Sequence, residues 1–154
     1  MRVVNDIEVR LIACDEKQGA VQSEVWRSGY QFKALISGSV LETAIQLDDG
    51  RYLLFLTDDI PYEDFLSINL LSHAGNLLDH ASIGYPYSTG RFSLVRMEPP
   101  NKVHFSFIDN AEWMIEILPK SVLRLPLVCE PKGVWRGMRM RRHFIVQGKP
   151  QPKN

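Results

Sequence analysis

The sequence predicts an all-β protein, an antiparallel β-sandwich or a partly open barrel of about ten short strands. Two observations carry this prediction. Apolar and polar residues alternate along many short runs, and Gly, Pro, Asn or Asp residues separate these runs every 8–12 residues. An Asp-Gly pair between two such runs adds a strong local signal for a β-hairpin.

The first half of the chain contains a predicted strand followed by a turn, and one predicted hairpin. Ile7, Val9 and Leu11 alternate with Glu8 and Arg10, which is typical of a half-buried strand. The turn-like "DEKQG" then leads into a second run, "AVQSEVW". A similar alternation over residues 41–47 is followed by "DDG" and by "RYLLFL", and we predict a hairpin there.

The second half continues the pattern. The run "NLLDHASI" follows the turn-like "HAGN", and the prolines of "EPPN" separate the runs "RFSLVRM" and "KVHFSFI". In "EWMIEIL", Trp113, Ile115 and Ile117 fall on one face of a strand, while Glu112 and Glu116 fall on the other. The stretch "VWRGMRMRRHFIV" is predicted as the final strand.

Residues 60–73 are the most ambiguous part of the chain. We predict a single helical turn around residues 61–64, followed by a strand in which Leu66, Ile68 and Leu70 share one face. The alternative is one short helix over 60–73, because Pro61 suits a first helical turn and acidic residues complement the positive end of the helix dipole.

Length and composition favour one globular unit. The 154 residues are 45% apolar and 23% charged, and a chain of this size can bury a substantial core. We predict a single β domain over 1–146 and a flexible C-terminal tail over 147–154, where prolines, amides and charged residues leave nothing apolar to pack.

The location of the protein is predicted from what the sequence lacks. The N-terminal residues "MRVVNDIEVR" have no apolar signal-peptide core, and no run reaches the roughly 18 apolar residues of a membrane span. We therefore expect a soluble, cytoplasmic protein with no membrane partner. Its two cysteines, Cys14 and Cys129, are expected to stay reduced and to pack as small hydrophobic residues.

The net charge of zero hides an uneven distribution. Residues 1–79 carry 6 basic and 13 acidic residues, whereas residues 80–154 carry 12 basic and 5 acidic residues. Such an asymmetry points to interaction surfaces, or to two halves that attract each other in the fold.

Familiar catalytic motifs are missing from the sequence. It has no glycine-rich nucleotide fingerprint, no H-E-x-x-H zinc motif and no G-x-S-x-G nucleophile elbow. We expect no cofactor and favour a non-enzymatic protein. His104 lies opposite the apolar face of its predicted strand, and we interpret it as a plain surface histidine or a hydrogen-bonded one rather than a general base.

One acidic segment is the candidate binding site. The stretch "FLTDDIPYEDF" holds four acids and no base, and its candidate partner-binding residues are Asp58, Asp59, Tyr62, Glu63 and Asp64. Its spacing does not match a calcium loop, and we assign it no metal. A helix start or a solvated acidic loop are the structural alternatives. Functionally, carboxylates could steer a basic partner toward an aromatic anchor.

The C-terminal stretch "WRGMRMRRHF" could form a second, basic surface. Its arginines are Arg136, Arg139, Arg141 and Arg142. Basic residues attract phosphates and aromatic residues can stack on bases. Overall neutrality and the acidic first half argue against nucleic acid as the partner.

These observations lead to one functional hypothesis and two alternatives. The hypothesis is a non-catalytic domain that binds a basic protein. In size, predicted compartment and charge, the chain resembles the small cytoplasmic immunity proteins with which bacteria neutralise their own secreted toxins. This resemblance implies that the acidic segment would occlude a basic toxin surface. The alternatives are a metal-assisted hydrolase that uses the same acids, and a nucleic-acid-binding β domain that uses the C-terminal arginines.

Overall fold

The computed structural model describes residues 1–15, 20–58, 65–84, 90–108, 111–123, 130–137 and 141–148. Within these ranges the chain forms thirteen β-strands and no helix, and every strand pairing is antiparallel. The all-β prediction is therefore confirmed.

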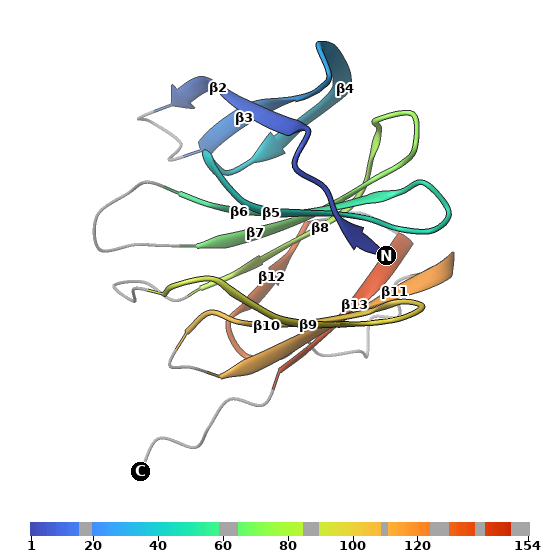
Figure 1. Cartoon of the computed structure of the whole chain (residues 1–154). Helices are drawn as coiled ribbons and strands as arrows, with labels where there is room; N and C mark the ends of the chain where they lie inside the picture. Colours follow the sequence, from blue (N-terminus) through green and yellow to red (C-terminus); the bar gives the residue numbers. More distant parts are fainter. Residues whose placement is uncertain are drawn as a thin grey trace.

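The strands form three sheets that are stacked as layers (Figure 1). A six-stranded central sheet has the order β1-β5-β6-β7-β8-β12, and a three-stranded sheet and a four-stranded sheet cover its two faces. The central strands are β1 (Arg2–Val3), β5 (Val40–Gln46), β6 (Tyr52–Thr57), β7 (Leu66–Leu71), β8 (Leu77–Ile83) and β12 (Val134–Arg136). The three-stranded sheet consists of β2 (Ile7–Asp15), β3 (Ala20–Arg27) and β4 (Tyr30–Ser37). The four-stranded sheet, in the order β13-β11-β10-β9, consists of β9 (Ser93–Glu98), β10 (Lys102–Ser106), β11 (Glu112–Leu123) and β13 (Arg141–Gly148).

The central strands β6 and β7 are buried on both faces because a sheet packs on each side of them. Along β6, Leu53 and Phe55 contribute to the core shared with the four-stranded sheet. Leu54 and Leu56 contribute to the core shared with the three-stranded sheet. A strand covered on both faces shows a continuous apolar run, as in "YLLFL", instead of a clean alternation.

Several predicted elements are confirmed by the strand pairing. β5 and β6 form the hairpin around "DDG", in which Gly50 has φ of +91° and its N–H donates to the Leu47 carbonyl at 3.0 Å. β2 pairs with β3, and β9 pairs with β10 across "EPPN". In β11, Trp113, Ile115 and Ile117 are all buried, as their shared face predicted.

The alternative of a helix over 60–73 is wrong for the part that the structure describes. Residues 66–71 form β7, which pairs with β6 on one side and β8 on the other. The favoured strand is thus confirmed, while the single helical turn over 61–64 lies outside the described residues. Burial of all six β7 side chains explains why this segment becomes a strand.

The predicted final strand is also wrong as a single element. β12 ends at Arg136 and pairs with β8 in the central sheet, while β13 begins at Arg141 and pairs with β11 in the four-stranded sheet. β13 extends to Gly148, which is opposite Trp113. The boundary predicted between domain and tail, after residue 146, therefore falls inside a strand.

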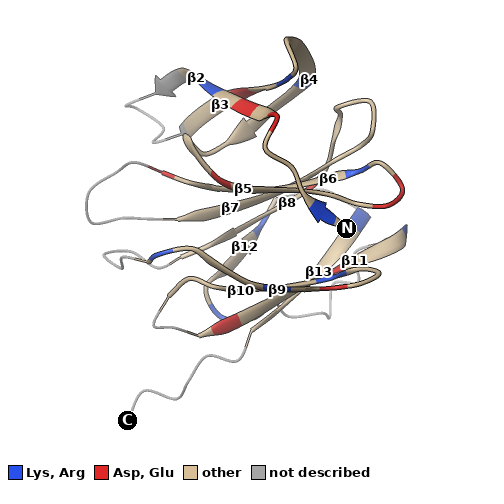
Figure 2. Cartoon of the chain, in the orientation of Figure 1, with Lys and Arg blue, Asp and Glu red and all other residues tan. Residues whose placement is uncertain are grey.

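The uneven charge of the sequence does not produce an acidic lobe and a basic lobe. Figure 2 shows residues of both signs on each of the three sheets. The antiparallel meander interleaves the two halves of the chain, because β12 from the basic half completes a sheet built from the acidic half. Among the described residues, none belongs to a helix with the length and apolarity needed to cross a bilayer.

Candidate functional site

A groove of about 1130 Å³ runs along the outer face of the four-stranded sheet. "Outer" here means the face turned away from the central sheet. We call this feature the outer groove. The side chains that line it include a charged group on β9, β10 and the start of β11, and an apolar group on β11 and β13. The charged group is Arg96, Glu98, Lys102, His104 and Glu112, and the apolar group is Met114, Val122, Leu123 and Ile145.

His104 is at the centre of the charged group. Its Nε2 lies 2.9 Å from Glu98 Oε2, and its Nδ1 lies 3.0 Å from Glu112 Oε1. Arg96 Nη1 is 3.3 Å from the same Glu112 oxygen. The side chain of His104 is 10% exposed, whereas those of Glu98 and Glu112 are about half exposed.

The strand register produces this arrangement. Val103 and Phe105 point into the core, so His104 between them must point outward. It lies opposite Arg96 on β9 and opposite Met114 on β11, which brings Glu98 and Glu112 to its two sides. The interpretation of His104 as a hydrogen-bonded histidine is confirmed.

The geometry has an electrostatic consequence for the two carboxylates. A neutral imidazole can donate one hydrogen bond, whereas an imidazolium can donate to both carboxylates at once. The hydrogen bond from His104 lowers the pKa of Glu98 below its ordinary value, and Lys102 contributes in the same direction. Each charged group of the cluster thus has a neighbour of opposite sign.

The apolar end of the groove results from an irregularity in the pairing of β11 and β13. Ile117 lies opposite Phe144, but the next matched pair is Val122 with Arg142, so four residues of β11 face a single residue of β13. Extra residues in one strand bend it and change where its side chains point. Val122 and Leu123 are left 48% and 60% exposed, and Ile145, which is 40% exposed, lines the same groove.

The outer groove offers carboxylates, basic groups and exposed apolar side chains. The described residues that line it include no Ser, Thr or Cys that could act as a nucleophile. Its histidine is engaged by carboxylates at both ring nitrogens. Across the described part of the chain, no three or more His, Cys, Asp or Glu side chains are grouped in a way that could hold a metal ion.

The predicted acidic site falls mostly outside the described residues. Asp58, directly after β6, is described and takes part in an interaction within the chain. Asp59, Tyr62, Glu63 and Asp64 lie outside the described ranges. Partner binding by this acidic segment therefore stays a prediction from the sequence.

The predicted basic surface is not assembled by the arginines that the structure describes. The Arg136 side chain is 2% exposed and Arg142 is also buried. Arg141 is exposed and donates to the Ser121 hydroxyl at 2.7 Å. Arg139 lies outside the described residues. The prediction is wrong for Arg136 and Arg142, because both strands carrying them pack into the interior.

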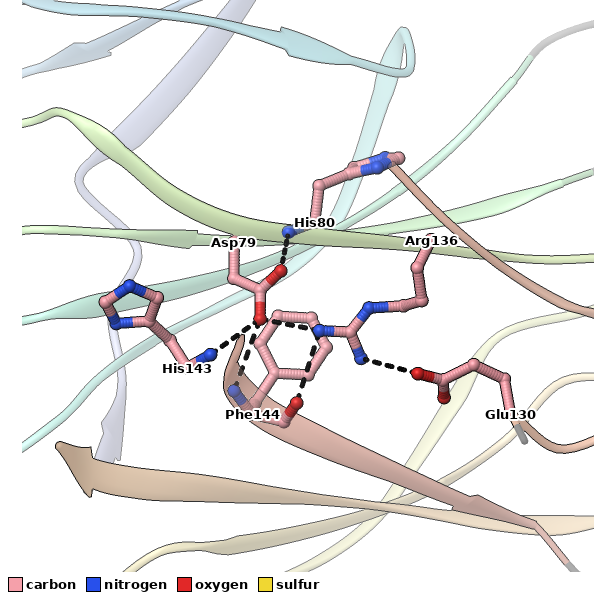
Figure 3. Close-up of polar contacts among 6 residues, drawn as sticks. All are labelled: Asp79, His80, Glu130, Arg136, His143 and Phe144. Atoms are coloured by element: carbon pink, nitrogen blue, oxygen red, sulfur yellow. Dashed lines mark hydrogen bonds and ion pairs between the residues drawn. The ribbon is translucent and has the colours of Figure 1, made fainter. Parts of the chain in front are cut away.

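Arg136 instead joins two sheets in a buried polar cluster (Figure 3). Its Nη2 lies 2.5 Å from Asp79 Oδ2, and the same carboxylate oxygen accepts the backbone N–H of His143 at 2.8 Å. Arg136 also donates to the Phe144 carbonyl at 3.2 Å and stacks over the Phe144 ring at 4.3 Å. β13 is an end strand of its sheet, and no described strand pairs with the edge that faces away from β11. The Asp79–Arg136 pair hydrogen-bonds backbone groups of β13 instead.

The sequence alone predicts part of the outer groove, namely which face of the strand some of its residues occupy. Alternation within "KVHFSFI" and "EWMIEIL" places His104 and Glu112 on outward faces. Their contact depends on the register between β10 and β11, which alternation alone does not specify. Arg96 and Glu98 were not identified as candidate site residues.

Comparison of the chain with protein-family models, with curated proteins and with solved structures found no match. The functional interpretation consequently rests on the geometry described above.

Proposed function

We propose that this chain is a non-catalytic protein-binding domain whose partner docks in the outer groove. The observation that carries the proposal is that three exposed apolar side chains, Val122, Leu123 and Ile145, line the same groove as the charged cluster around His104. Apolar anchors next to a polar rim are the usual anatomy of a protein interface.

The exposed apolar side chains of the groove favour a protein segment, while its volume is close to that of small-molecule pockets. Pockets for small molecules are commonly about 300–1000 Å³, and the outer groove has about 1130 Å³. Because the charged side chains already pair with one another, they can remain solvated at the rim while a partner covers the apolar end. We assign specificity to the charged cluster and most of the affinity to the apolar end.

The narrower proposal concerns the identity of the partner. The acidic segment from Asp58 to Asp64 would add a second contact and select a basic protein, as in an immunity-type inhibitor of a toxin. Support for it comes from the charge pattern of the sequence. The cytoplasmic location is part of this narrower proposal.

A capture experiment with matched variants tests the proposal. Tagged protein is incubated with lysate of the native cells, and retained proteins are quantified for the wild type, Ile145→Asp and Leu35→Asp. Leu35 is 46% exposed on β4 of the three-stranded sheet, close to the 40% exposure of Ile145, so it controls for a charge added to any sheet surface.

We expect one protein to be retained by the wild type and by Leu35→Asp, and to be lost with Ile145→Asp. Retention by Ile145→Asp would exclude the groove as the contact. The narrower proposal is tested separately by changing Asp58, Asp59, Glu63 and Asp64 to Lys. If the partner's affinity and its salt dependence then stay unchanged, the acidic segment is not part of the interface.

A further inference from the structure

β9 is the end strand of the four-stranded sheet. One side of it pairs with β10, and among the described strands none pairs with the other side (Figure 1). Its residues are half-buried or exposed along their whole length. An edge strand of this kind offers backbone N–H and C=O groups to a strand of another chain.

Near the end of β9, successive side chains alternate between the outer and the inner face of the sheet. Arg96 and Glu98 point to the outer face, where they lie opposite His104 and Lys102 of β10. Met97 between them points inward and packs against the apolar core. The Arg96 and Glu98 side chains are 57% and 50% exposed, so their contacts to Glu112 and His104 leave a large part of each accessible.

This alternation favours one particular self-pairing. In an antiparallel pair of identical strands related by a two-fold axis, residues opposite each other must point to the same face. Centring the pair on Arg96 would place two arginines together. Centring it on Met97 places each Arg96 opposite Glu98 of the other copy, which gives two attractive cross-strand pairs.

We propose that two copies of this chain associate by antiparallel pairing of their β9 strands, centred on Met97. The two four-stranded sheets then join over residues 96–98 of each copy, because β9 ends at Glu98 before two prolines. The two Met97 side chains meet on the inner face, next to the apolar cores that they already contact.

The charged residues on β9 give this pairing its selectivity. Charges on an edge strand normally discourage pairing with unrelated strands. Here the alternating signs repel an identical strand in the Arg96-centred register and attract it in the Met97-centred register. Because Arg96 and Glu98 also line the outer groove, the second copy contributes its own Arg96 and Glu98 at the end of that groove. The inference goes beyond the proposed function and does not depend on it.

Charge reversal at the two positions tests both the association and its register. The molar mass in solution is measured by light scattering over a range of protein concentrations up to about 1 mM, the weak end of specific association. The variants are Arg96→Glu, Glu98→Arg and the double variant Arg96→Glu/Glu98→Arg. Lys33→Glu, an exposed charge reversal on β4, is the control.

We expect a concentration-dependent dimer for the wild type and for Lys33→Glu. Each single reversal turns two attractive pairs into two repulsive ones and should raise the dimer Kd about tenfold. The double reversal restores opposite charges between copies and should return the Kd to within about threefold of the wild type. Within each chain, the double reversal puts an acid at position 96 beside Glu112 and a base at position 98 beside His104. These intrachain contacts become less favourable, so they cannot explain the rescue.

Two results would overturn the inference. A wild type that stays monomeric throughout the concentration range excludes the dimer. A dimer that the single reversals leave unchanged, or that the double reversal fails to restore, excludes the Met97-centred register. Circular dichroism of each variant identifies any loss of folding, so that a misfolded variant is not counted as a monomer.

Discussion

Asp79 and Arg136 form an ion pair with 2.5 Å between Oδ2 and Nη2, and neither side chain is more than 2% exposed. Asp79 belongs to β8 and Arg136 to β12, which are neighbours in the central sheet. Through the backbone of His143 and Phe144, the pair also binds β13 of the four-stranded sheet. One buried polar cluster thus fixes the position of two layers relative to each other.

Replacement of Asp79 by Asn should lower the free energy of unfolding by about 3–5 kcal/mol, because it leaves the Arg136 charge buried without its partner. Urea denaturation measures this loss. The control is Asp48→Asn, since Asp48 is 82% exposed and pairs with the N-terminal amine at 2.7 Å; its loss should stay below about 1 kcal/mol.

The double variant Asp79→Asn/Arg136→Met separates charge from packing. Removing both charges should destabilise the protein less than the sum of the two single changes, which a double-mutant cycle quantifies. Additive losses, or a loss for Asp79→Asn no larger than that of the control, would show that the ion pair does not hold the layers together.

The all-β class and many strand positions could be predicted because alternation and turn residues are local features. The β5–β6 hairpin is an example, since "DDG" lies between two apolar runs. The three-layer arrangement could not be predicted in this way. The continuous run of β6 is equally typical of a strand buried on both faces and of a short buried helix.

The candidate site was less predictable than the fold. Alternation correctly places His104 on the outer face, but its two carboxylate partners come from β9 and β11. Likewise, Arg136 looked like a surface residue because nothing in the local sequence indicates Asp79, which is 57 residues away. Both arrangements depend on long-range register, which one sequence does not specify.

The hydrogen bond between His104 and Glu98 has a measurable effect on titration. Because it lowers the pKa of Glu98 in the folded protein, it stabilises the fold above the ordinary carboxyl pKa of 4.5. This stabilisation is lost as the pH falls through the lowered pKa of the folded state. In His104→Leu, we expect the pKa of Glu98 to rise toward 4.5, as measured by NMR of the side-chain carboxyl carbons.

Asp6 provides the control within the same spectra. Its pKa is lowered by the hydrogen bond from Arg27, at 2.7 Å, in a different part of the protein. The pKa of Asp6 should therefore be the same in the wild type and in His104→Leu. If the pKa of Glu98 also stays unchanged, the His104 contact does not control its titration.

Gly75, in the turn between β7 and β8, should not tolerate a side chain. Its φ is +88°, in the left-handed region, and an added Cβ would lie 2.8 Å from Cγ of Phe32. Gly75→Ala should lower the free energy of unfolding by about 2 kcal/mol through backbone strain and the clash with Phe32. In Gly137→Ala the new Cβ meets no atom of the described residues within 4 Å, so the change should stay within about 0.5 kcal/mol. Equal losses in urea denaturation for both variants would contradict this explanation.

Asn69 is a buried amide, and we expect that its replacement by an apolar residue raises the free energy of unfolding. It lies on β7, fully buried, and neither its side-chain nitrogen nor its oxygen has a hydrogen-bond partner among the described residues. A buried polar group without a partner costs about 1–3 kcal/mol, and a β-branched apolar residue suits a strand. Asn69→Val should therefore raise the free energy of unfolding by about 1 kcal/mol.

Asn101 is the matched comparison, because its Nδ2 donates to the Ile117 carbonyl at 2.9 Å. Asn101→Val removes that hydrogen bond and should lower the free energy of unfolding by about 1 kcal/mol. The two variants thus make the same chemical change with opposite expected signs in urea denaturation. A loss of stability in Asn69→Val comparable to that in Asn101→Val would mean that a bound water hydrogen-bonds the buried Asn69 amide. Replacing Asn69 by Val would then remove those hydrogen bonds.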